Sequence, residues 1–139
     1  MRVFVTGGTG FLGGSLIRQL LEQGQDVVAL VRSTSRGQAL AELAGSLPGR
    51  LDFTEGDITD KESMRAGMSG VDGVYHLAAW YKVGANAREA KLAKGINVGG
   101  TRHVLELMRE LQVPKGVYTS TLTVNSDTQG VEVDEEYVY

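Results

Sequence analysis

The sequence of 139 residues contains no cysteine, carries little net charge and lacks any long apolar run. Without cysteine there are no disulfides, no thiolate metal ligands and no cysteine nucleophile. The formal net charge of −3 gives no indication of a nucleic acid or an acidic membrane as partner. No segment approaches the ~20 apolar residues that cross a bilayer, and the first apolar run meets glycines at once, unlike a signal peptide. We therefore expect a cytoplasmic protein with no metal site.

Glycine, in contrast, is abundant. The chain has 19 glycines, about twice the average usage of roughly 7%. Many of them stand where an apolar run ends, which indicates positional roles rather than low complexity. The chain shows no internal repeat and no linker, so residues 1–139 are predicted to form one domain.

Short apolar runs alternate with longer segments of helical spacing. The short runs are predicted to be buried parallel strands at residues 2–6, 26–31, 51–55, 73–77 and 115–120. Helices are predicted at residues 12–23, 38–43, 61–68 and 87–111, and the polar, acidic residues 125–136 show no obvious element. This alternation is typical of an α/β fold with a doubly wound parallel sheet, here of about five strands.

The first strand runs directly into a glycine-rich turn that opens the first helix. The glycines stand in a G-x-x-G-x-x-G frame, which permits a tight turn, close approach of a pyrophosphate and close packing of helix on strand. The helix start offers free N–H groups and the positive end of its dipole. The sequence therefore predicts a Rossmann-type turn that binds NAD(H) or NADP(H), rather than a glycine-rich turn that binds nothing. The residues assigned to this binding are Gly7, Thr9, Gly10, Phe11, Leu12 and Gly13.

The second strand ends at Arg32, with Ser33 and Arg36 close by. In a Rossmann sheet this end lies beside the adenosine ribose. An acidic residue there would bind the 2′-hydroxyl, whereas a guanidinium suits a 2′-phosphate. We predict a preference for NADP(H), with NAD(H) as the alternative if Arg32 is merely solvated.

Four further motifs follow the glycine turn in order. They are Gly-Asp-Ile-Thr-Asp at 56–60, Tyr-His-Leu-Ala-Ala at 75–79, Asn-Val-Gly-Gly-Thr at 97–101 and Val-Tyr-Thr-Ser-Thr at 117–121. With these motifs the chain resembles the extended short-chain dehydrogenase/reductases. It looks closest to the NAD-dependent epimerase/dehydratase family and its dihydroflavonol 4-reductase-like branch.

The resemblance implies further cofactor-binding residues. Asp57 and Ile58 would bracket the adenine, the backbone of residues 77–79 would line the cofactor, and Asn97 would support the backbone of the active site. The residues of the fourth-strand motif assigned to cofactor binding are Leu77, Ala78 and Ala79. From the residues alone, Asp57 could equally be a cap or turn residue, and Asn97 could cap a helix.

The resemblance also implies an active-site hydroxyl at the end of the fifth strand. Family register places it on Thr121, with Ser120 as the alternative; both could instead be ordinary strand-end hydroxyls. His76 is interpreted as a packed core residue and His103 as a surface residue. Trp80, Tyr81 and Lys82 follow the fourth strand, at the edge where ligands bind, and would either touch the nicotinamide or substrate or form a plain loop.

Family members carry a catalytic Tyr-x-x-x-Lys pair after the fifth strand. The last lysine of this chain is Lys115, so the pair is absent from the 139 residues. We expect an incomplete Rossmann domain, lacking its substrate region, that binds dinucleotide weakly and has no activity by itself.

Three functions remain open at this point. The first is hydride transfer between a nicotinamide cofactor and a carbonyl or alcohol substrate of small size, as in dihydroflavonol reductases. The second is nucleotide-sugar epimerisation or dehydration, and the third is non-catalytic dinucleotide sensing on the same fold. The resemblance also makes a homodimer through the long helix an expectation. Neither nucleic acid nor membrane is expected as a partner.

Overall fold

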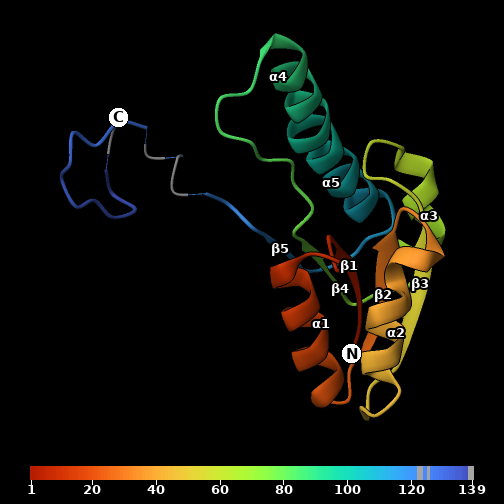
Figure 1. Cartoon of the computed structure of the whole chain (residues 1–139). Coiled ribbons are helices and arrows are strands. Elements are labelled where there is room, and N and C mark those ends of the chain that lie inside the picture. Colours follow the sequence, from red (N-terminus) through yellow and green to blue (C-terminus); the bar gives the residue numbers. More distant parts are fainter. Residues whose placement is uncertain (122–123, 125, 138–139) are drawn as a thin grey trace.

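The structure is a computed structural model that describes residues 1–121, 124 and 126–137, apart from the side chain of Arg36. Its elements follow in the order β1 (Arg2–Thr6), α1 (Phe11–Glu22), β2 (Asp26–Val31), η1 (Thr34–Gly37), α2 (Gln38–Ala44), β3 (Leu51–Glu55), α3 (Lys61–Met68), β4 (Gly73–His76), α4 (Ala87–Lys94), η2 (Gly95–Gly100), α5 (Thr101–Glu110) and β5 (Gly116–Tyr118). Figure 1 shows the sheet between its helices, with α4 and α5 following one another almost in line.

The five strands form one parallel sheet in the order β3-β2-β1-β4-β5. The chain adds strands on one side of β1 as far as β3 and then crosses to the other side for β4. The predicted doubly wound Rossmann-type sheet is therefore confirmed. The order in which strands are added to the sheet therefore reverses between β1 and β4. Such sheets bind ligands at this point, at the carboxyl ends of the strands.

Alternating side chains of β1 divide the core into two layers. Val3 and Val5 pack with Ile17 and Leu21 of α1 and with Leu40 of α2. On the opposite face, the core consists of Phe4, Val28, Leu30, Ile58, Met64, Met68, Val71, Val74, Val104, Leu107 and Val113. Helices α3 and α5 supply this second layer, so both faces of the central strands are covered and their near-continuous apolar runs are explained.

The long predicted helix is interrupted by the π-helical segment η2 between α4 and α5. Gly100 ends this segment, and a Cβ there would lie 2.6 Å from Ile58 Cδ1. Of the two adjacent glycines, Gly100 is therefore needed for close packing, whereas an added Cβ on Gly99 would have no neighbour within 4 Å. π-helical turns of this kind often occur at functional sites.

Two strands are shorter than predicted. β4 ends at His76 and β5 spans only Gly116–Tyr118, whose residues are all exposed. Two further bonds extend the pairing, from Thr119 N–H to the carbonyl of His76 at 3.1 Å and from Val74 N–H to the carbonyl of Lys115 at 3.0 Å. β5 is the outermost strand of the described sheet, so it has a neighbour on one side only.

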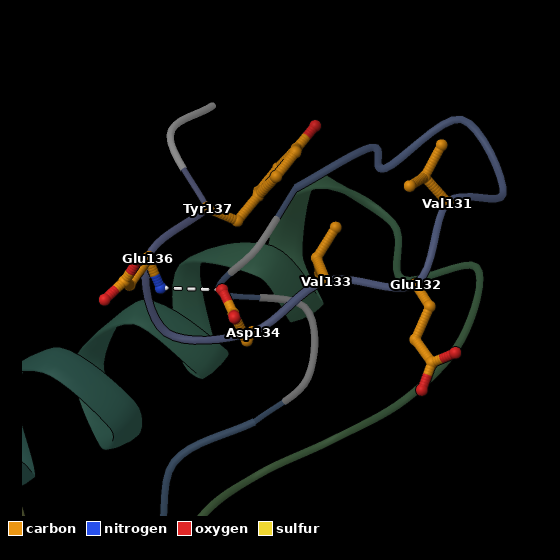
Figure 2. Close-up of a pocket in the computed structure, with 6 residues that line it drawn as sticks. All are labelled: Val131, Glu132, Val133, Asp134, Glu136 and Tyr137. Carbon is orange, nitrogen blue, oxygen red and sulfur yellow. Dashed lines mark hydrogen bonds between the residues drawn. The ribbon is translucent and has the colours of Figure 1, made fainter.

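The C-terminal segment leads away from the sheet (Figure 1). After β5 the described residues form no α-helix or β-strand, in agreement with the polar composition. Figure 2 shows residues 131–137 folded around a hollow lined by their own side chains, with a 3.0 Å bond from Glu136 N–H to Asp134 Oδ1. No residue of the predicted site lines this hollow. Among the described helices, none is long and apolar enough to cross a membrane.

Candidate functional site

A pocket of about 350 Å³ lies at the carboxyl ends of the central strands, where the strand order reverses. It is lined by Gly7, Thr9, Gly10, Leu30, Val31, Arg32, Gly56, Asp57, Ile58, Leu77, Ala78, Ala79, Trp80 and Ile96. Nine of the residues predicted from sequence therefore meet in one cavity: Gly7, Thr9, Gly10, Arg32, Asp57, Ile58, Leu77, Ala78 and Ala79. Segments that are far apart in the chain come together there because parallel strands end at the same edge of the sheet.

The glycine turn is held by contacts that only glycine tolerates. Gly7 has φ 74°, and a Cβ on it would lie 2.7 Å from the backbone nitrogen of Ala78. A Cβ on Gly13 would lie 2.1 Å from the carbonyl oxygen of Gly7. Gly10 N–H donates to that same oxygen at 3.0 Å. The turn is thus packed against the residues that follow β4 on one side and against α1 on the other.

Gly10 is less constrained by the protein than Gly7 or Gly13. Its φ is −84°, and the only heavy atom near an added Cβ would be the Gly7 oxygen at 3.3 Å. Gly10 nevertheless lines the pocket. The space in front of this backbone is therefore open to a ligand that must approach closely, as a pyrophosphate would.

Helix α1 begins at this turn without a side-chain cap and with no acidic residue in its first turn. Its first residues, Phe11 and Leu12, are 98% and 55% exposed. Neither they nor the buried Gly13 line the pocket. Their predicted contribution rests on their backbone N–H groups at the positive end of the helix.

Two residues of opposite charge, Arg32 and Asp57, line the pocket where β2 and β3 end. Thr59 donates from its backbone N–H and its hydroxyl to Asp57 Oδ1, at 2.9 and 2.7 Å. The backbone bond, helped by the side-chain bond and by the charge of Arg32, holds the pKa of the Asp57 carboxyl below its usual value. Asp57 is thus both a turn residue and a pocket residue, and its carboxylate lines the same pocket as Arg32.

Ile58, which lines the pocket, is contacted by both η2 and α5. Gly100 leaves room for its side chain. The Nδ1 atom of His103 lies 2.9 Å from the Ile58 carbonyl oxygen, to which an Nδ1–H would donate. The interpretation of His103 as a plain surface residue is therefore wrong, because this side chain is half-buried against the loop that forms the pocket.

Asn97 does not cap a helix, since it lies within η2. Its Oδ1 accepts from Trp80 N–H at 2.8 Å, and its Nδ2 donates to the Trp80 carbonyl at 2.9 Å. This pair of bonds fixes the backbone of a residue that lines the pocket, although Asn97 itself does not line it. The observed geometry agrees with a supporting role for Asn97.

Ser120 and Thr121 follow β5 and are exposed, and neither lines the pocket. They lie at the same edge of the sheet as the end of β4, since Thr119 still pairs with His76. Their assignment as active-site hydroxyls stays a prediction. Leu30, Val31, Gly56 and Ile96 were not predicted from sequence although they line the pocket; the first two belong to a core strand, where apolar residues carry no site signal.

Comparison with known proteins identifies the family. The model of the NAD dependent epimerase/dehydratase family matches residues 3–138. The chain belongs to this family. A putative dihydroflavonol 4-reductase from Synechocystis is 39% identical over 96% of the chain. A UDP-glucose 4-epimerase from Streptomyces lividans is 33% identical over 96% of the chain. The chain spans only 37% and 40% of these two relatives.

Solved structures of epimerase/dehydratase relatives share the fold. A UDP-glucose 4-epimerase from Bifidobacterium longum, in complex with NAD⁺ and UDP, is 25% identical with a TM-score of 0.83, over 98% of this chain and 42% of that one. Vestitone reductase from alfalfa is 30% identical with a TM-score of 0.69, over 88% of this chain and 36% of that one. Both reductases and epimerases are therefore among the relatives of this family member.

Proposed function

We propose that this chain is the dinucleotide-binding part of an oxidoreductase that transfers hydride between a nicotinamide cofactor and a carbonyl or alcohol substrate. The observation that carries the proposal is that the glycine turn, Arg32, Asp57 and residues 77–79 line one pocket. The pocket suits an elongated ligand with a diphosphate near its centre. The accessible backbone at Gly10 would bind the diphosphate, Asp57 and Ile58 line one end of the pocket, and Ala78 and Ala79 line the other.

Each part of the pocket has a distinct task in this proposal. The glycine turn and the N–H groups of Phe11 and Leu12 bind the pyrophosphate, and Asp57 and Ile58 hold the adenosine end. The small Ala78 and Ala79 leave room for a flat ring against the backbone, which Asn97 supports through Trp80. The bound nicotinamide supplies or accepts the hydride, whereas the protein supplies position and charge.

Thr121, or Ser120, would bind the substrate oxygen in the complete site. The acid/base pair Tyr-x-x-x-Lys is absent from these 139 residues, since no lysine follows Lys115. We therefore expect these residues to bind a dinucleotide weakly and to have no turnover by themselves.

We further propose that NADP(H) is preferred over NAD(H), because Arg32 lines the adenosine end of the pocket. A guanidinium donates two parallel hydrogen bonds to a phosphate, and its positive charge attracts the negative charge of the phosphate. Titration of the protein with NADPH and NADH tests this. In the Arg32→Asp variant the preference should fall by about tenfold or more, since one charge-assisted bond is replaced by repulsion. Tighter binding of NADH to the unaltered protein would refute the preference.

The binding of a dinucleotide at the glycine turn is tested by Gly10→Leu. Its side chain would occupy the open space in front of the turn, so the affinity for both dinucleotides should fall by about tenfold or more. Gly45→Leu is the matched control: Gly45 lies at the end of α2, outside the pocket, with its nearest neighbour 3.6 Å from an added Cβ. Unchanged affinity in Gly10→Leu would refute the proposed site.

Nucleotide-sugar epimerisation or dehydration is the second candidate, favoured by the similarity to UDP-glucose 4-epimerases in sequence and structure. Product analysis distinguishes the two reactions. A reductase consumes reduced cofactor in proportion to product, whereas an epimerase converts a UDP-sugar without net consumption. Because these 139 residues are expected to have no turnover by themselves, the analysis needs a chain that also contains a Tyr-x-x-x-Lys pair; if such a chain bound dinucleotide but converted neither class of substrate, it would instead be a sensor.

A homodimer is an additional proposal. Helix α5 exposes Leu105, and η2 exposes Val98, at 57% and 50%. Apolar side chains on the helix that the family resemblance links to dimerisation favour this arrangement. Analytical ultracentrifugation of the protein and of Leu105→Glu tests it, and a monomer at all concentrations would refute it.

A further inference from the structure

His76 is a buried polar residue at the end of β4, and none of the functions above uses it. Its side chain is 3% exposed. The imidazole lies between two threonines, with Nδ1 2.7 Å from Thr6 Oγ1 and Nε2 2.9 Å from Thr101 Oγ1. The ring also stacks on Tyr118 of β5, with ring centroids 5.6 Å apart. The imidazole thus connects β1, β4, β5 and α5 at one point.

The direction of these hydrogen bonds follows from a third contact. The backbone N–H of Ala78 donates to Thr6 Oγ1 at 3.2 Å. Thr6 has one hydroxyl proton, and His76 Nδ1 is its acceptor among the described residues. A neutral imidazole then carries its proton on Nε2, from which it donates to Thr101. Burial lowers the pKa of His76, which favours this neutral form.

This chain of bonds ends on the wall of the pocket. Ala78 lines the pocket, and its nitrogen lies where a Cβ on Gly7 would come within 2.7 Å. The preceding residue, Leu77, donates its backbone N–H to the carbonyl of Thr6 at 3.3 Å. The N–H of Ala78 donates instead to the side-chain hydroxyl of Thr6. The distance between the glycine turn and the Ala78 backbone is therefore set by Thr6.

We propose that Thr6, His76 and Thr101 are positioning residues, which hold the Ala78 backbone against the glycine turn through one directed chain of hydrogen bonds and thereby shape the pocket for the dinucleotide. The inference rests on the proposed function. It concerns residues that do not line the pocket themselves. Their effect on a ligand is carried by the position of Ala78.

Variants of Thr6 test the proposal through dinucleotide affinity. Thr6→Val keeps the shape but leaves both Ala78 N–H and His76 Nδ1 without a partner, so the dissociation constant should rise about tenfold. Thr6→Ser keeps the hydroxyl and should stay within about threefold of the unaltered protein. Thr101→Val breaks the far end of the chain, away from the pocket, and should weaken binding by about threefold. Far-UV circular dichroism checks that each variant folds.

The tautomer of His76 provides a second readout. In ¹⁵N NMR of the histidine-labelled protein, Nδ1 should have the shift of an unprotonated imidazole nitrogen and Nε2 that of a protonated one. A proton on Nδ1 would overturn the inference, even if Thr6→Val failed to fold. Equal dinucleotide affinity in the unaltered protein and a folded Thr6→Val would also overturn it. A protein that binds no dinucleotide at all would instead refute the proposed function, and this inference with it.

Discussion

Two neighbouring glycines of α1 should respond to the same substitution with opposite sign. Gly13 lies against the glycine turn, where a Cβ would come within 2.1 Å of the Gly7 oxygen and 2.7 Å of Gly8 Cα. At Gly14 the nearest atoms would be the Gly8 oxygen at 3.7 Å and Leu40 Cδ2 at 3.9 Å. These are ordinary contact distances. We compare Gly13→Ala with Gly14→Ala.

The expected magnitudes follow from packing and helix propensity. Overpacking costs about 1–3 kcal/mol, and a contact with backbone atoms that cannot rotate away belongs at the upper end. Alanine stabilises a helix by about 0.5–1 kcal/mol relative to glycine. Gly13→Ala should therefore lower the free energy of unfolding by about 2 kcal/mol, whereas Gly14→Ala should raise it by about 0.5–1 kcal/mol.

Urea unfolding measures both changes. Trp80 is the only tryptophan, so its fluorescence follows the transition, with circular dichroism as a second probe. For a typical m-value of about 2 kcal/mol/M, the Gly13→Ala midpoint should fall by roughly 1 M. Gly14→Ala serves as the control for helix propensity. If Gly13→Ala were as stable as Gly14→Ala, the tight packing of helix on turn would be refuted.

Two further predictions concern buried polar contacts. Burial lowers the pKa of His76, so below about pH 6.5 the unfolded chain binds a proton on this imidazole more readily than the folded chain does. The free energy of unfolding should therefore decrease as the pH falls below about 6.5 and should level off below the pKa of the folded protein. Urea unfolding between pH 5 and 8 should show this slope, and the slope should be smaller in His76→Gln, where only the carboxylates whose pKa is lowered by folding still contribute near pH 5; an equal slope in the two proteins contradicts the reasoning. Asn97→Ala removes both bonds to the Trp80 backbone, so the anisotropy of tryptophan fluorescence should decrease. Asn97→Asp keeps the acceptor for Trp80 N–H, so its anisotropy should lie between those of the unaltered protein and Asn97→Ala. An unchanged anisotropy in Asn97→Ala would show that the two bonds from Asn97 do not fix the Trp80 backbone.

The repeating pattern of apolar residues determined the fold class and the placement of most elements. The bounds of β1, β2, β3 and α3 agree with the prediction, because each is marked locally by apolar periodicity and by glycine or a capping residue. The glycine turn is equally local, since strand, turn and helix follow one another without interruption. Local signals failed at β4 and β5, where the end of a strand depends on how far its neighbour continues.

Only the tertiary structure decided the contacts between residues that are far apart in the chain. Sequence placed Asp57, Leu77 and Asn97 in separate motifs, but it held no signal that His103 would bind the Ile58 carbonyl or that Ile96 would line the pocket. Which residues a helix contacts depends on the angle at which it crosses the sheet and on the number of residues in each helical turn. The π-helical segment η2 changes this number directly before α5. These are set by packing of the whole domain, and a local pattern of residues does not contain them.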